Sequence, residues 1–126
     1  MAIQRETKLI VKPFKDLLIY RGWVVKNFHG NQFQEGVPDA YICHMSYTPR
    51  WVEFKVVDEY GKIHLTPAQK KLFPVWQSLG VPIYIIAAKD LRGSDNQLLR
   101  ERLYKKLFEE PNVIYAFSER LYQFLY

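Results

Sequence analysis

The sequence lacks the features of secreted, membrane-embedded and disulfide-rich proteins. Cys43 is its single cysteine, so no internal disulfide can form. No apolar run approaches the ~18 residues that a membrane-spanning helix needs, and the charged segment 1–5 is not followed by the apolar core of a secretory signal. We therefore expect a cytoplasmic protein in a reducing compartment, with no membrane partner.

Internal repeats, low-complexity tracts and proline-, glycine- or serine-rich linkers are also absent. A chain of 126 residues with 48% apolar content can bury one sizeable core and is too short for two, so we predict a single domain over residues 1–126. The net charge of +5 favours an anionic partner such as nucleic acid. Solvated lysines on a basic surface account equally well for that charge.

The hydrophobic pattern predicts alternating helices and strands, and therefore an α/β fold with a mixed central sheet flanked by helices. Pro13 either kinks the first helix or lies in the first turn of a helix that begins near Lys12. A turn around Thr48-Pro49 should join the second and third strands as a hairpin. Helices are expected over 6–20, 66–80, 94–109 and 118–126, and strands over 23–28, 40–45, 50–57, 81–87 and 113–117.

Two of these elements have patterns that specify their environment. The run 81–87 is almost continuously apolar, which is typical of a strand covered on both faces. The helix 66–80 begins with the hydroxyl cap Thr66 and a proline, and it ends at Gly80. Its apolar stripe, expected to face the sheet, consists of Ala68, Leu72, Val75 or Trp76, and Leu79.

Glu53 and Lys55 lie two residues apart in a predicted strand, so their side chains should leave the same face of the sheet. The apolar residues Val52, Phe54 and Val56 would face the other way. By itself, such a pair is well explained as a surface ion pair on an exposed strand face.

Asp39 directly precedes the neighbouring strand, and a hairpin would bring it level with Glu53. Two carboxylates that converge repel one another unless a cation or a lysine compensates. Mg²⁺ binds oxygen ligands at about 2.0–2.1 Å and also accepts a backbone carbonyl, which Phe54 could provide. Taken alone, Asp39 after a proline is equally typical of a turn.

Four short motifs occur in a fixed order along the chain. They are Gly36-Val37-Pro38-Asp39, Trp51-Val52-Glu53-Phe54-Lys55, Leu65-Thr66-Pro67-Ala68-Gln69 and Leu79-Gly80-Val81-Pro82. Together they resemble the VRR-NUC family, the virus-type replication-repair nucleases of the PD-(D/E)XK superfamily. The resemblance covers about residues 6–88, which would form the nuclease core, whereas residues 91–126 would form a C-terminal helical extension without a family counterpart.

The resemblance implies a role for each matching residue. Asp39 corresponds to the aspartate of the PD motif and Glu53 to the acidic residue of the (D/E)XK motif, and both would bind the metal together with the Phe54 carbonyl. Lys55 would activate or orient the attacking water and stabilise the phosphate in the transition state. Gln69 corresponds to a catalytic-site glutamine at the start of the next helix; without the resemblance it would be an exposed residue of the first helical turn.

The resemblance also implies that the first helix contributes one more acidic residue to the metal site. Glu6 is the candidate in that region, and Asp16 is the alternative further along the helix. Lys70, Lys71 and His29 are candidates for contacts with nucleic acid. His44 and His64 show no metal-ligand spacing and are interpreted as polar groups of strands and loops.

The family resemblance implies a DNA endonuclease that uses Mg²⁺, with Mn²⁺ as a substitute. Its substrate would be branched or structured DNA, such as Holliday junctions in replication, recombination or repair, and a symmetric homodimer would place two active sites on two strands. A phage-encoded protein in the cytoplasm of a bacterial host is compatible with the virus-type family. The alternative is a module on the same fold that binds nucleic acid without cutting it, which has no need for mutually repelling carboxylates.

Overall fold

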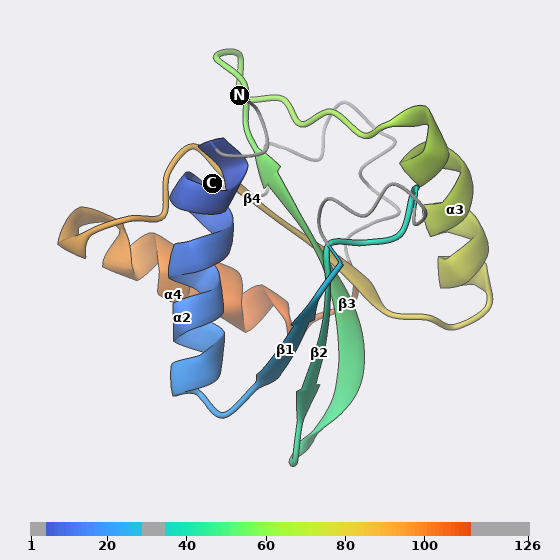
Figure 1. Cartoon of the computed structure of the whole chain (residues 1–126), viewed down its shortest axis with the longest axis horizontal. Coiled ribbons are helices and arrows are strands. Elements are labelled where there is room, and N and C mark those ends of the chain that lie inside the picture. The colour runs from blue at the N-terminus through green and yellow to red at the C-terminus, as the bar shows by residue number, and fades with distance from the viewer. Residues whose placement is uncertain (1–4, 29–34, 112–126) are drawn as a thin grey trace.

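The computed structural model describes residues 5–28 and 35–111 of the chain (Figure 1). His29, the predicted strand 113–117 and the predicted helix 118–126 lie outside the described residues. The described elements are the π-helical turn η1 (Thr7–Val11), α2 (Lys12–Tyr20), β1 (Val24–Asn27), β2 (Ala40–His44), β3 (Tyr47–Val56), α3 (Pro67–Ser78), β4 (Ile83–Ala88), the 3₁₀ turn η2 (Ser94–Asn96) and α4 (Gln97–Lys106).

The four strands form one mixed sheet in the order β1-β2-β3-β4, which confirms the predicted α/β class. The pairs β1–β2 and β2–β3 are antiparallel, and β3–β4 is parallel. Helices α2 and α4 lie against one face of the sheet and α3 against the other (Figure 1). All six residues of β4 are buried, as predicted for a strand covered on both faces.

Residues after β4 take part in the core beneath α2 and α4. Leu103 of α4 and Leu107, the C-cap residue of this helix, are fully buried there, and Leu99 packs against the same cluster, as the helical spacing predicted. The helix begins at Gln97 after the turn η2, later than its expected start at Ser94. No described helix is long and apolar enough to cross a membrane.

Pro13 lies in the first turn of α2, which begins at Lys12, in agreement with the second of the two predicted outcomes. Proline has no N–H to donate to the carbonyl four residues earlier, here that of Leu9. The Leu91 N–H donates to this carbonyl at 2.8 Å. The first helix thereby remains continuous through η1, and the segment after β4 is tied to its side.

The predicted turn around Thr48-Pro49 is wrong, because the turn between β2 and β3 lies at Met45–Ser46. Thr48 and Pro49 belong to β3, at an irregularity of the β2–β3 pairing where both lie opposite Cys43. A bulge of this kind leaves one residue out of the hydrogen-bond ladder, so it accommodates a proline, which has no N–H to contribute.

The side of α3 that faces the sheet also differs from the expected stripe. The buried residues are Gln69 and Phe73, and Trp76 packs against the same core. Of the two alternatives Val75 and Trp76, the structure thus confirms Trp76, because Val75 is 53% exposed. Leu79, which was also expected to face the sheet, is 76% exposed. The helix therefore turns Gln69, Phe73 and Trp76, at positions i, i+4 and i+7, toward the sheet. Gln69 reaches the polar residues of β3 described below.

Candidate active site

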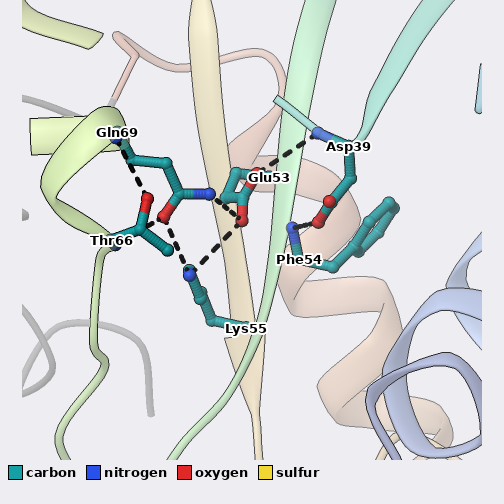
Figure 2. A network of polar contacts seen from close by, with 6 residues as sticks. All are labelled: Asp39, Glu53, Phe54, Lys55, Thr66 and Gln69. Atoms are coloured by element: carbon teal, nitrogen blue, oxygen red, sulfur yellow. Dashed lines mark hydrogen bonds and ion pairs between the residues drawn. The ribbon is translucent and has the colours of Figure 1, made fainter. Parts of the chain in front are cut away.

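The ordered pairing of β2 with β3 ends where Ala40 lies opposite Val52, so Asp39 arrives level with Glu53, as predicted. The Asp39 N–H donates to Glu53 Oε1 at 3.2 Å. In return, Asp39 Oδ2 accepts a hydrogen bond of 2.9 Å from the Phe54 N–H (Figure 2). The Glu53 carboxylate is thus held by the backbone N–H of Asp39, and the Asp39 carboxylate by the backbone N–H of Phe54, the residue after Glu53. The two side chains therefore converge.

The Phe54 carbonyl lies on the same side of β3 as these carboxylates. In an extended strand, the N–H and C=O of one residue leave the same edge. Because the Phe54 N–H points to Asp39, the carbonyl of Phe54 also faces this edge. Its side chain lies on the other face of the sheet, fully buried, with its ring edge against Phe14. A position for the carbonyl beside the two carboxylates was expected from the sequence.

Glu6, at the start of η1, adds a third carboxylate. One oxygen each from Glu6, Asp39 and Glu53 can be chosen such that all three lie within 4.8 Å of one another. Two ligands on opposite sides of a Mg²⁺ ion are about 4.2 Å apart, so side-chain movements of less than about 1 Å would let one cation contact all three carboxylates. Asp16, the alternative acidic residue, forms an exposed ion pair of 3.5 Å with Lys12 and is not part of this cluster.

Glu53 dominates the electrostatics of the cluster, because its side chain is almost completely buried. Burial, and next the negative charge of Asp39, raise the pKa of Glu53 to about 8, although Lys55 and Gln69 act in the opposite direction. A carboxyl group in this state holds a proton at neutral pH unless a cation takes the place of that proton. The all-oxygen donor set and the accumulated negative charge fit Mg²⁺ or Mn²⁺.

Lys55 and Gln69 complete the polar network beside Glu53 (Figure 2). Gln69 Nε2 donates to Glu53 Oε2 at 2.8 Å, and Lys55 Nζ donates to Gln69 Oε1 at 3.0 Å. Lys55 Nζ also lies 3.5 Å from Glu53 Oε2. The face shared by Glu53 and Lys55, predicted from their spacing, is the one beneath α3, and Gln69 points toward the sheet rather than to solvent.

Thr66, the N-cap of α3, holds Gln69 in this position. The Gln69 N–H donates to Thr66 Oγ1 at 3.1 Å, and the Thr66 N–H donates to Gln69 Oε1 at 2.9 Å, which together form a capping box. The same Oε1 atom accepts from Lys55, so the helix cap and the candidate site share one acceptor. From the sequence, Thr66 was interpreted as a cap alone; the T-x-x-Q spacing was the available signal for its second role.

Gly36 explains how two of the sequence motifs meet in space. Its φ of +82° lies in the left-handed region, and a Cβ built on it would come within 2.9 Å of the Ala68 carbonyl oxygen. Both conditions require glycine. The segment that leads to Asp39 therefore packs directly against the first turn of α3, the turn that also contains Gln69.

A cleft of about 230 Å³ opens beside the acidic cluster, and its lining includes Glu6 and Lys55. His64, which was interpreted as a loop residue without function, also lines this cleft. Lys70 and Lys71 are exposed on α3, next to Gln69 in the sequence.

Comparisons with protein-family models, with curated proteins and with solved structures find no match for this chain. The site is therefore characterised by its own geometry. Carboxylates from three segments that are distant in the sequence converge next to a lysine held by a glutamine. Such a site has the chemistry to bind a divalent cation and, beside it, a phosphate group.

Proposed function

We propose that the protein is a metal-dependent nuclease that hydrolyses phosphodiester bonds in DNA, of the PD-(D/E)XK type that its motifs resemble. One observation carries the proposal: Glu6, Asp39 and Glu53 converge within 4.8 Å of one another, beside Lys55. Nothing in the packing of a small α/β core requires three carboxylates at one point. A cation-binding role offsets the cost of placing them together.

Asp39, Glu53 and the Phe54 carbonyl, together with Glu6, would hold Mg²⁺ or Mn²⁺. When bound, the cation would act as a Lewis acid on the phosphate and lower the pKa of nearby water. Hydrolysis forms a bond between the water oxygen and phosphorus and breaks one ester P–O bond; a proton leaves the water and one is gained by the departing oxygen.

Lys55 can act on the phosphate directly. Its ammonium group carries three N–H donors, of which one is directed to Gln69 Oε1. A second donor can face Glu53 Oε2, 3.5 Å away. The third can orient the attacking water or bind a phosphate oxygen, and the positive charge would stabilise the additional negative charge of the transition state. Gln69 restricts the position of Nζ, so that less ordering is needed when the substrate binds.

The proposed substrate is DNA, in particular branched or structured DNA such as a Holliday junction. The net charge of +5 is consistent with a polyanionic partner. The exposed Lys70 and Lys71 would contact the backbone of the DNA beside the cleft. A homodimer would act on two strands of a junction at once. We regard a module that binds DNA without cutting it as the weaker alternative, because the burial of Glu53 beside Asp39 is costly and contributes nothing to binding an anion.

The decisive experiment incubates the protein with supercoiled plasmid, a synthetic four-way junction and a linear duplex, each with Mg²⁺, Mn²⁺ or a chelator. Lys55→Ala should slow cleavage by about a hundredfold or more, about 3 kcal/mol, while DNA affinity changes little. Asp39→Asn should stop cleavage through loss of the metal. The matched control is Asp16→Asn, which removes an exposed acidic group of the same helix as Glu6 and should cut like the wild type.

Two results would contradict the proposal. If the wild-type protein binds DNA but cuts none of the substrates with either metal, the protein is a binding module. If Lys55→Ala and Asp39→Asn cut as fast as the wild type, the active site lies elsewhere.

A further inference from the structure

The cleft beside the acidic cluster extends beyond the residues that the proposed mechanism uses. It begins at Glu6 and Lys55 and continues to Arg5 and to a turn that contains Asp58 and His64. Because a phosphate bound at Lys55 would lie at one end of this cleft, a DNA strand that continues from that phosphate has the cleft as an adjoining path.

Asp58 is fixed in place by the turn that follows β3. Its Oδ1 accepts hydrogen bonds from the N–H groups of Tyr60 at 2.8 Å and Lys62 at 2.9 Å. These bonds, that of Lys62 foremost, and a contact with His64 hold the pKa of Asp58 below its usual range. Asp58 therefore presents an anionic oxygen, Oδ2, in a defined direction.

His64 is oriented by this oxygen. Its Nε2 lies 2.7 Å from Asp58 Oδ2, which leaves Nδ1 on the other side of the ring. The His64 side chain is 71% exposed, so a ligand in the cleft can reach it. When both ring nitrogens carry a proton, Nε2–H donates to Asp58 Oδ2 and Nδ1–H is left to donate to an anionic ligand.

We propose that this part of the cleft binds the phosphate adjacent to the scissile one, with the Arg5 guanidinium and the imidazolium form of His64 as donors: His64 Nδ1–H donates to the phosphate, and Nε2–H donates to Asp58, the positioning residue for His64. This inference rests on the proposed nuclease function and specifies its substrate further. The strand to be cut must continue past the scissile bond by at least one phosphate on the side of the cleft. A substrate that ends at the scissile position on that side lacks this contact.

The test uses oligonucleotide substrates in which one phosphate at a time, on either side of the mapped cleavage position, is replaced by a neutral methylphosphonate. His64→Ala should raise KM about three- to tenfold, as expected for loss of one exposed phosphate contact, and should leave kcat within about twofold. At one neighbouring position, the methylphosphonate should raise KM for the wild type by a larger factor than for His64→Ala, in which only the Arg5 contact remains to be lost.

Two further variants separate this contact from general effects of charge and folding. Asp58→Asn keeps an oxygen for the hydrogen bonds of the turn but presents an amide to His64. It should therefore weaken the contact with the same phosphate and raise KM by a smaller factor than His64→Ala does. Arg102→Ala removes an exposed cation from α4, which packs on the opposite face of the sheet from α3. It should show the wild-type response at every methylphosphonate position.

The outcomes distinguish the inference from the function on which it rests. If the wild type cuts DNA and His64→Ala responds to every methylphosphonate as the wild type does, the inference is refuted and the nuclease function stands. A fall in kcat with unchanged KM would also refute it, because His64 would then act on the chemical step. If the wild type cuts no DNA, the proposed function fails, and the inference fails with it.

Discussion

The metal-free protein should lose stability as the pH rises, because of one buried carboxyl group. Burial and the charge of Asp39 raise the pKa of Glu53 from its usual 4.5 to about 8. An acid whose pKa is raised by folding binds its proton more tightly in the folded state. Its stabilising contribution is therefore complete below pH 4.5 and is lost as the pH rises through about 8. At about 1.4 kcal/mol per pKa unit, the loss is at most about 5 kcal/mol, and relaxation of the site reduces it.

Glu53→Gln isolates this effect, because glutamine has nearly the same size and does not titrate. At pH 5 the variant should be less stable than the wild type by about 1–3 kcal/mol, since its amide Nε2 faces donors such as Gln69 Nε2 or the Asp39 N–H. At pH 9 the wild type carries the buried charge and the variant does not. The difference in free energy of unfolding should therefore shift by several kcal/mol in favour of the variant between these pH values.

Urea denaturation at pH 5, 6, 7, 8 and 9 in the presence of a chelator measures these free energies. A second series with Mg²⁺ at pH 8 should restore stability to the wild type, because the proposed cation would bind the folded state with Glu53 ionised. Glu53→Gln should gain much less from Mg²⁺. Asp16→Asn, which lies outside the acidic cluster, serves as the control and should follow the wild type in both series.

One result would refute the reasoning outright. If the difference between Glu53→Gln and the wild type is the same at pH 5 and pH 9 without metal, Glu53 does not take up a proton on folding. The burial of Glu53 would then be compensated by Lys55 and Gln69 alone, and no cation would be needed to offset the charge of the cluster.

Two further predictions concern the packing around the site. Gly36→Ala and Gly80→Ala both place alanine at a positive φ, but only at Gly36 would the new Cβ meet the Ala68 carbonyl oxygen, at 2.9 Å. Gly36→Ala should therefore lower the melting temperature and the cleavage rate more than Gly80→Ala, as measured by thermal unfolding and plasmid cleavage. Thr66→Val removes the hydroxyl acceptor for Gln69 at nearly constant volume, and should cost about 1 kcal/mol of stability in urea denaturation as well as slow cleavage. Thr66→Ser should restore both; equal cleavage by the valine and serine variants would show that the cap does not position Gln69.

The convergence of Asp39, Glu53 and Lys55 could be predicted from the sequence because it depends on local rules. Side chains two residues apart in a strand share a face, and a short hairpin fixes which residues of its strands are level. Neither rule requires knowledge of the rest of the fold. For the same reason the prediction survives the wrong position of the turn: the bulge opposite Cys43 absorbs the extra residue at the far end of the pairing from Asp39.

The orientation of α3 could not be predicted from its apolar residues, because a polar residue occupies the position that faces the sheet. Gln69 and Phe73 lie on the buried side, whereas a search for apolar periodicity passes over Gln69 and selects Leu79, which is 76% exposed. Two kinds of contact hold the helix in this orientation: the hydrogen bonds of Gln69 with Glu53 and Lys55, two residues of another element, and the burial of Phe73. Local pattern and tertiary structure disagree here at a candidate functional residue, where such conflicts are expected.

The position of Glu6 depends on contacts that are distant in the sequence. A π-helical turn and Pro13 separate Glu6 from the regular part of α2, so ideal helical geometry does not project its direction. The hydrogen bond from the Leu91 N–H to the Leu9 carbonyl fixes this part of the helix against the segment after β4. Sequence reasoning could therefore name Glu6 as the candidate, with Asp16 as the alternative, but could not derive from helix geometry that Glu6 points toward Asp39 and Glu53.

The two faces of the sheet differ in a way that follows from the site. Among the described residues, the face beneath α2 and α4 has a core of sixteen buried apolar residues, and the face beneath α3 has six. On the α3 face, β3 contributes Glu53 and Lys55 where apolar side chains would otherwise pack, and β4 places Ile85 and Ala87 beside them. Since apolar burial supplies most of the folding free energy, the α2 and α4 face must stabilise the domain. The α3 face can then hold buried polar groups whose arrangement is set by hydrogen bonds.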